Sequence, residues 1–239
     1  MATFLMVPGA RHGGWAFGRV KRRLEGAGHE VFAPSLTGLA ERAHLVSPAV
    51  DLSFHVDDVV RVFESWDLHD VILAGHSYGG LVITGVADRI RGAIGTLVYL
   101  DAVTPENGKS LVDIGGAALT ASRAHNVVLV DGVELFEPRH EAFYGVVDAA
   151  DRAWMRARMT PHPWKCFEEK LWFDEAVLAG IPTHHVVSTR IPQREARHPD
   201  MVAKARADGR WWVIPGAHDV MITDPDAVTA VLERIAAAG

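Results

Sequence analysis

Alternating strands and helices predict an α/β fold, in which helices cover both faces of a parallel sheet. Three observations carry this prediction. Short apolar runs stop at glycine or proline, as residues 71–74 do before Gly75, and such runs are typical of buried strands. Amphipathic stretches with apolar residues at helical spacing separate these runs. The chain has 239 residues, of which 49% are hydrophobic and 23% charged, which suits one domain with a large core.

The expected elements follow one another in a regular order. The strands are short apolar runs closed by turn residues, and they lie at residues 4–7, 30–33, 71–74, 97–100, 185–188 and 211–214. The helices are amphipathic or follow a strand directly, and they lie at residues 15–27, 52–66, 81–90 and 225–238. Asp224 as N-cap and Pro225 at the first helical position mark the start of the last helix. Turn residues and weak periodicity predict a long loop over residues 35–52.

Residues 104–180 break the alternation of strands and helices. This segment contains several helix-like stretches without a clear strand–helix repeat, and its aromatic residues include Trp154, Trp164, Trp172 and Phe173. An insertion at this point of the chain would form a lid over the ends of the strands. We therefore expect a core of residues 1–103 and 181–239 and a lid of residues 104–180.

Composition argues against several classes of function. A net charge of −6 argues against nucleic acid as the main partner, because a nucleic-acid-binding domain favours a basic face. Cys166 is the only cysteine, so the chain can form no intrachain disulfide and no cysteine-based zinc site. No membrane span and no signal peptide are expected, because the apolar runs are too short. These observations favour a cytoplasmic protein. We expect it to act on a small molecule without a cofactor, as a monomer or a homodimer.

Residues 75–80 contain the G-x-S-x-G pattern of a nucleophile elbow, with Ser77 at its centre. The pattern lies between an expected strand and an expected helix, which is the context that the motif requires. Such a tight turn strains the serine backbone and exposes its Oγ, so the flanking positions need residues without bulk. The alternative is a glycine-rich turn that binds phosphate at a helix N-terminus, but the chain has neither G-x-G-x-x-G nor a Walker lysine.

A serine hydroxyl is a poor nucleophile unless a base removes its proton. In enzymes with a nucleophile elbow, the acid and then the base follow the serine along the chain. His218 lies just after the last expected strand and is the candidate base. The other histidines are scattered and form no metal-binding spacing with carboxylates or Cys166, so no metal site is expected.

Several stretches of the chain resemble the α/β-hydrolases, namely residues 7–15, 33–38, 75–80, 98–101 and 216–219. More narrowly, they resemble the branch that holds plant methylesterases, salicylate-binding esterases and hydroxynitrile lyases, with their bacterial relatives. The resemblance spans nearly the whole chain and is weakest in the lid. It implies a six-stranded, mainly parallel sheet flanked by helices, with a small helical lid between the fourth and the fifth core strand.

The resemblance also implies an oxyanion hole built from two backbone N–H groups. By position these belong to Ala10, in the loop after the first strand, and to Tyr78, directly after the nucleophile. Pro8 stands where many relatives have histidine, but the donor lies further along the chain. His12 and Trp164 are candidates for the rim of the substrate pocket.

The acid of the triad is the open question. Relatives commonly place an aspartate after the fifth core strand, but residues 186–193 contain no carboxylate. Asp101 is the preferred candidate, because it ends a neighbouring strand and the carboxyl ends of the strands face the active site. The haloalkane dehalogenases, also α/β-hydrolases, take their acid from this strand. The alternatives are Glu195, a water-supported dyad, or an Asp101 that only orders its own turn.

Three functions compete on this scaffold. The first is a serine-dependent hydrolase of a small carboxylic ester, whose acyl group is apolar or aromatic if the lid tryptophans line the pocket. The second is a hydroxynitrile lyase, but those enzymes have a lysine directly after the catalytic histidine, where this chain has Asp219. The third is a non-hydrolytic binder or a biosynthetic enzyme such as a cyclase, because a fold does not decide function. We expect the ester hydrolase.

Overall fold

The computed structural model describes residues 1–189 and 197–238. Six strands form one sheet in the order β2-β1-β3-β4-β8-β9, and every neighbouring pair is parallel. The strands are β1 (Thr3–Val7), β2 (Glu30–Phe32), β3 (Val71–His76), β4 (Ile94–Leu100), β8 (Thr183–Ser188) and β9 (Trp211–Ile214). The predicted parallel α/β fold with six strands is confirmed.

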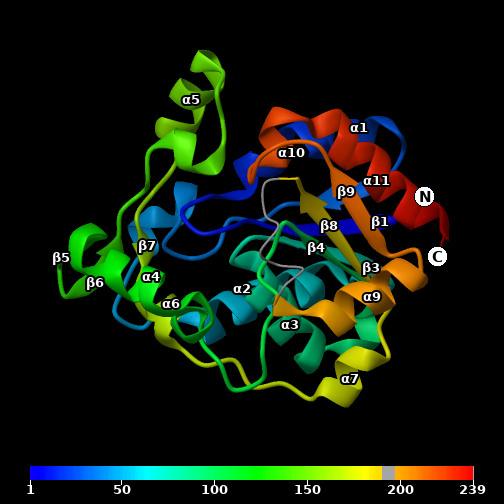
Figure 1. The fold of residues 1–239 in the computed structure, drawn as a ribbon, viewed down its shortest axis with the longest axis horizontal. Coiled ribbons are helices and arrows are strands. Elements are labelled where there is room, and N and C mark those ends of the chain that lie inside the picture. Colours follow the sequence, from blue (N-terminus) through cyan, green and yellow to red (C-terminus); the bar gives the residue numbers. More distant parts are fainter. Residues whose placement is uncertain (190–196, 239) are drawn as a thin grey trace.

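Helices cover both faces of this sheet (Figure 1). One face carries α2 (Leu52–Trp66) and α3 (Gly79–Arg89), whereas the other carries α1 (Gly18–Gly26), α10 (Val220–Thr223) and α11 (Pro225–Ala238). The 3₁₀ turns η1 (Gly14–Phe17), η2 (Ala40–Leu45) and η3 (Arg91–Ala93) lie in the connections, and α9 (Pro199–Ala207) precedes β9. The helix expected over residues 15–27 therefore begins as a 3₁₀ turn.

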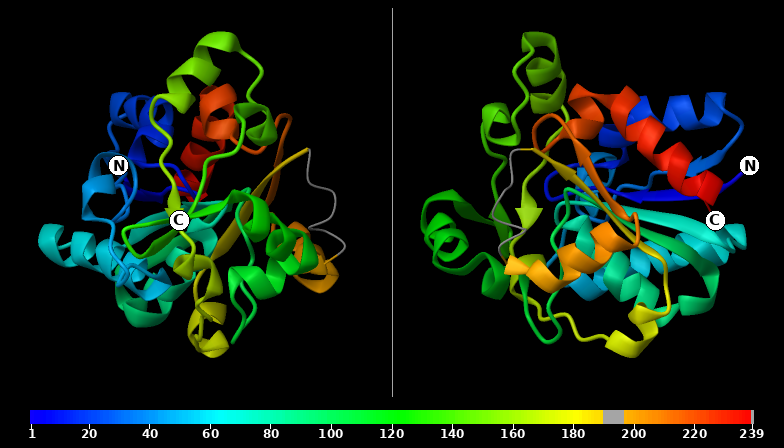
Figure 2. Two further views of the ribbon diagram at one scale, coloured as in Figure 1. Left: turned by 90° about the vertical axis from the view of Figure 1, so that its left-hand side faces the viewer. Right: turned by 45° about the vertical axis from the view of Figure 1, so that its right-hand side comes forward.

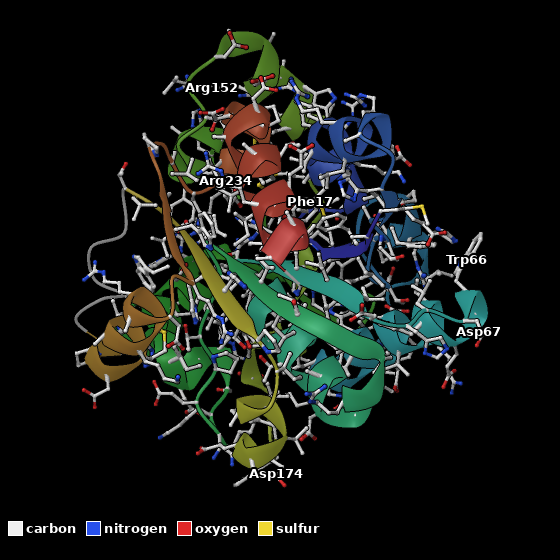
Figure 3. The ribbon with its side chains drawn as sticks, turned by 90° about the vertical axis from the view of Figure 1, so that its right-hand side faces the viewer. Phe17, Trp66, Asp67, Arg152, Asp174 and Arg234 are labelled. Atoms are coloured by element: carbon white, nitrogen blue, oxygen red, sulfur yellow. The ribbon has the colours of Figure 1, made fainter. Side chains whose placement is uncertain are left out.

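The apolar runs of the strands divide their side chains between two cores. Phe4 and Met6 of β1 pack with α1, α10 and α11, whereas Leu5 and Val7 pack with α2 and α3, because successive side chains of a strand point to opposite faces. Helices cover both faces of the sheet, which explains why the strands are continuously apolar and do not alternate between apolar and polar residues. In contrast to these buried side chains, Trp66 at the end of α2 points away from the protein (Figure 3) and is 64% exposed.

The segment between β4 and β8 forms a cap beyond the carboxyl ends of the strands, opposite the two chain termini (Figures 1 and 2). The last helix of the segment, α7 (Glu175–Ala179), instead packs against α3, and the helices of the cap are α4 (Leu111–Asn126), α5 (Ala149–Arg156) and α6 (Lys165–Glu168), with the 3₁₀ turn η4 (Glu141–Tyr144). An antiparallel sheet joins them, made of β5 (Val127–Val130), β6 (Val133–Phe136) and β7 (His162–Pro163). The sequence predicts a helical lid over residues 104–180, so this sheet is an addition that the prediction missed. A lid function stays a prediction.

The described helices include none that combines the length and the apolar character needed to cross a membrane. The longest is α4 with 16 residues, and it is interrupted by Gly116, whose φ is 60°.

We expect Leu73→Ala to lower the free energy of unfolding by about 2–5 kcal/mol, because the Leu73 side chain is fully buried in β3 and its removal leaves a cavity. Urea denaturation followed by circular dichroism measures this loss. Val213→Ala in β9 is the control, since that side chain is 55% exposed, and it should cost less than about 1 kcal/mol. Equal losses for the two variants would contradict the assignment of the core.

Candidate active site

Ser77 occupies a sharp turn between β3 and α3, and its φ of 52° places it in the left-handed region. That conformation is strained for any residue other than glycine. An ideal Cβ on Gly75 would lie 2.5 Å from the carbonyl oxygen of Gly79, and one on Gly79 would lie 2.7 Å from the carbonyl oxygen of Val7. The two glycines of the motif therefore allow the strand, the helix and β1 to meet at the serine.

The three candidate triad residues lie in one chain of hydrogen bonds. Ser77 Oγ is 2.9 Å from Nε2 of His218, and Nδ1 of His218 is 2.6 Å from Oδ2 of Asp101. Asp101 follows β4, and His218 follows β9. Because an ionised carboxylate only accepts, its contact with Nδ1 places the imidazole proton on that atom. Nε2 is then left to accept the proton of the serine hydroxyl.

The end of β8 holds the Asp101 carboxylate in place. Asp101 is fully buried and has a φ of 43°. Its backbone N–H donates to the carbonyl oxygen of Val186 at 2.7 Å, and its carboxylate accepts from the backbone N–H of Ser188 at 3.1 Å and from the Ser188 hydroxyl at 3.2 Å. Ser188 thus stands in the stretch where relatives place the acid, and it supports Asp101, the candidate acid after the neighbouring strand β4. Glu195, the alternative acid, lies outside the described residues.

The loop after β1 touches the serine turn. An ideal Cβ on Gly9 would lie 2.7 Å from Nδ1 of His76 and 3.0 Å from Cβ of Ser77, so only a glycine allows this approach. The next residue is Ala10, whose backbone N–H is one expected oxyanion donor. In the part of the chain that the structure describes, neither this N–H nor that of Tyr78 donates to a backbone carbonyl. Both donors therefore stay available for a ligand oxygen.

Neither candidate for the pocket rim lies at a rim. His12 and Trp164 are each only 1% exposed. The ring of His12 faces inward, with Nδ1 2.8 Å from the Ala10 carbonyl oxygen and Nε2 2.9 Å from Asp219. Trp164 packs edge-on against Phe136, with ring centroids 5.2 Å apart. The expected position at the rim is wrong, because the turn before His12 and the aromatic core of the cap direct both side chains into the protein. A role of these residues in substrate binding stays a prediction.

Two other tryptophans of the cap also have structural surroundings. Trp154 packs edge-on against Trp15 with ring centroids 5.0 Å apart, and Trp172 is 71% exposed. An apolar or aromatic acyl group stays a prediction, since these positions give it no direct support.

A buried neutral histidine, His76, lies beside the candidate base. Burial, together with the nearby His218, lowers the pKa of His76 to about 3. The His76 Nε2–H donates to the carbonyl oxygen of His218 at 3.1 Å. Burial also lowers the pKa of three further histidines, which are His55, His162 and His184. His76 therefore remains neutral beside His218 and does not compete with it for a proton.

In two groups of side chains, possible metal-ligating atoms lie within 4.8 Å of one another. The first group is His55, His162 and Cys166, and the second is His76, His218 and Asp219. In the first group, Nε2 of His55 donates to the carbonyl oxygen of Thr37 at 2.9 Å and Nδ1 lies 3.0 Å from the Tyr78 hydroxyl. Both nitrogens are thus engaged. Burial also raises the pKa of the thiol in this group, which opposes the thiolate that a metal requires. The second group contains His218, whose two nitrogens also have partners.

Comparisons with known proteins agree with the resemblance that the sequence shows. A model of the alpha/beta hydrolase family matches residues 4–231. A carbendazim hydrolyzing esterase of Nocardioides sp. (strain SG-4G) is 37% identical over 250 residues, which cover 100% of both chains. Salicylic acid-binding protein 2 of Nicotiana tabacum is 31% identical over 105 residues, 44% of this chain and 40% of that protein. The solved structure of an extracellular alpha/beta-hydrolase from a Paenibacillus species superposes with a TM-score of 0.79 at 22% identity and covers 98% of both chains.

We expect acid to destabilise the protein through its buried histidines. The pKa of His76 is about 3 in the folded protein, against an ordinary value of 6.5. Between these two pH values, His76 binds a proton in the unfolded chain but not in the folded protein. Stability is therefore lost as the pH falls from 6.5 toward 3, by up to about 1.4 kcal/mol per pH unit for this histidine. Urea denaturation at pH 7, 6 and 5 should show a smaller loss for His76→Gln than for the wild type.

His69→Gln is the matched control, because the His69 side chain is 77% exposed and meets solvent in both states. It should keep the wild-type dependence on pH. The same loss of stability with falling pH in His76→Gln and wild type would show that His76 takes up a proton in the folded protein.

Proposed function

Because this chain belongs to the alpha/beta hydrolase family, we propose that it is a serine esterase with the catalytic triad Ser77, His218 and Asp101. An ester hydrolase is the function that the full-length esterase relative supports. The observation that supports the triad is the unbroken chain of hydrogen bonds from Asp101 through His218 to Ser77. The non-hydrolytic alternatives are not favoured, and Asp219, in place of the lysine expected of a hydroxynitrile lyase, argues against that activity.

Acylation begins when Ser77 Oγ attacks the carbonyl carbon of the ester. His218 Nε2 takes the hydroxyl proton as the new bond forms, and the electrons of the carbonyl double bond move onto its oxygen. The backbone N–H groups of Ala10 and Tyr78 then donate to this oxyanion. Asp101 keeps the imidazole in the required tautomer and stabilises the imidazolium.

The tetrahedral intermediate collapses when the bond between the carbonyl carbon and the alcohol oxygen breaks. The leaving alcohol takes the proton from Nε2 of His218, which restores the neutral imidazole. A water molecule then attacks the acyl group on Ser77 while His218 accepts one of its protons. The serine leaves with that proton, and the carboxylic acid is released.

The charges around the base suit this cycle. Asp101 is fully buried, so its negative charge and the positive charge of a protonated His218 compensate each other away from water. His76 has a pKa of about 3 and stays neutral, with its ring centroid 4.6 Å from that of His218. A second cation at that distance would raise the energy of the imidazolium.

The proposed substrate is a small ester with an apolar or aromatic acyl group. The full-length relative is named for the hydrolysis of carbendazim, which is a methyl carbamate with an aromatic ring system. A carbamate carbonyl is open to the same attack by serine, so carbendazim belongs in the substrate test beside simple esters.

We expect the wild type to hydrolyse at least one member of a panel of p-nitrophenyl esters, methyl esters and carbendazim. Ser77→Ala should abolish this turnover, because it removes the atom that carries the acyl group. Ser47→Ala, in the loop before α2, is the control and should keep the wild-type rate. Turnover that survives Ser77→Ala would remove Ser77 as the nucleophile. A wild type that hydrolyses nothing but binds aromatic acids would favour the binder.

We expect Asp101→Asn to lower kcat by about 10⁴, because an amide at this position can donate to Nδ1 and so stabilises the wrong tautomer of His218. Initial rates on the best substrate of the panel measure this loss. Asp131→Asn is the control, since Asp131 lies in the exposed turn between β5 and β6 and should keep wild-type kcat. A loss smaller than about tenfold would exclude Asp101 from the triad.

A further inference from the structure

His12 and Asp219 form a buried pair beside the proposed active site. Nε2 of His12 lies 2.9 Å from Oδ2 of Asp219, and Nδ1 lies 2.8 Å from the carbonyl oxygen of Ala10. The two residues come from opposite ends of the chain, and neither is more than 1% exposed. The proposed reaction uses neither side chain, although each belongs to a loop that the reaction uses.

The hydrogen bonds of His12 determine the charge of this pair. A carbonyl oxygen only accepts, so Nδ1 of His12 must carry a proton. Burial alone raises the pKa of the Asp219 carboxyl, but its contacts with His12 and then with His76 hold that pKa below its ordinary value. The ionised carboxylate also only accepts, so Nε2 carries a proton as well. These two contacts are the ones that an imidazolium makes, and they would make the pair a buried ion pair.

The His12 end of the pair holds a strained turn. The backbone N–H of His12 donates to the carbonyl oxygen of Gly9 at 3.2 Å, which closes a four-residue turn around Ala10 and Arg11. The φ of Arg11 is 69°, the sign that a type II turn requires at its third residue and that normally calls for glycine. Two histidines hold the central peptide of this turn, because His12 binds its C=O and Nδ1 of His162 accepts from its N–H at 3.2 Å.

The Asp219 end of the pair belongs to the turn that carries the base. Asp219 directly follows His218, and its backbone N–H donates to the carbonyl oxygen of Tyr144 at 3.2 Å. Its own carbonyl oxygen accepts from the N–H of Ile222 at 2.9 Å, which anchors the turn to α10. The side chain of Asp219 thus joins the turn of the base to the turn of the expected oxyanion donor.

We propose that the ion pair between Asp219 and His12 is a positioning unit. It holds the turn that carries the Ala10 N–H and the turn that carries His218 in a fixed arrangement during ester hydrolysis. This inference rests on the proposed esterase function. Type I and type II turns differ in the orientation of the central peptide, so loss of the pair frees this peptide to flip and Arg11 to leave its strained conformation. The Ala10 N–H belongs to the preceding peptide, whose Gly9 carbonyl oxygen accepts from the backbone N–H of His12, so a displaced His12 also releases this donor from its fixed orientation. Stabilisation of the oxyanion falls, whereas binding of the ground-state substrate does not depend on the turn.

The charge of the pair is tested by ¹⁵N NMR of histidine-labelled wild-type protein at pH 7, with the His12 signals assigned from the spectrum of His12→Phe. Both ring nitrogens of His12 should carry protons, as in an imidazolium. An unprotonated nitrogen on His12 would overturn the ion pair. This measurement needs no ester turnover, so failure of the pair is distinguishable from failure of the proposed function, which the substrate panel reports.

The positioning role is tested by steady-state kinetics of Asp219→Asn, His12→Phe and the double variant. Each single variant should lower kcat by about 10- to 100-fold and leave KM within about threefold, because the lost interaction acts in the transition state. The double variant should be no slower than the slower single variant, since the two residues act as one unit. Asp219→Asn preserves the shape of the side chain and decides the outcome alone if His12→Phe does not fold.

Asp151→Asn is the matched control, because Asp151 also pairs with a cation, Arg19, in a partly buried site but belongs to α5 of the cap. It should keep the wild-type kcat. Unchanged kcat in Asp219→Asn, a change confined to KM, or losses that multiply in the double variant would each overturn the positioning role.

Discussion

The left-handed backbone of Ser77 is the constraint on which the whole site depends. With a φ of 52°, the chain turns from β3 into α3 within two residues, and the serine stands clear of the sheet. Gly75 and Gly79 permit this turn because any side chain on them would meet backbone atoms. The same close contact brings the end of β1 against the turn, and the loop that follows β1 is thereby placed beside the serine.

Strain recurs at the end of the neighbouring strand. Asp101 also has a positive φ, 43°, and a non-glycine residue in this region costs of order 1–3 kcal/mol. Hydrogen bonds to Val186 and Ser188 of β8 hold it there, and β3 and the buried carboxyl-terminal half of β4 supply the rigid frame. Apolar packing of β3 and β4 thus supports two strained residues whose side chains meet His218. The stability of the core and the geometry of the site are therefore linked.

The elements with strong local signals were predictable from the sequence. The bounds of α2 and β9 match the prediction residue for residue, because amphipathic spacing and aromatic or β-branched runs are local properties. Asp101 was also predictable as a neighbour of His218, since the order of parallel strands brings the ends of β4 and β9 to one edge of the sheet. Its support by Ser188 was not, because a serine carries no specific signal.

Two features of the structure escaped prediction for different physical reasons. The inward direction of His12 depends on the positive φ of Arg11, and no sequence rule predicts that conformation for an arginine. The sheet of the cap was missed because its strands are short, and β7 has only two residues. Asp131 and Gly132, both with positive φ, form a turn that favours a hairpin, and this signal could have been found.

The proposed mechanism requires that Ser77, His218, Asp101 and the two backbone N–H groups act on one carbonyl group. A crystal structure of the enzyme treated with a phosphonate that reacts covalently with activated serines tests it most directly. We expect phosphorus bonded to Ser77 Oγ, its free oxygen within hydrogen-bond distance of the N–H groups of Ala10 and Tyr78, and Asp101 on Nδ1 of His218. An adduct on another residue, an oxygen turned away from both N–H groups, or another carboxylate on Nδ1 would contradict it.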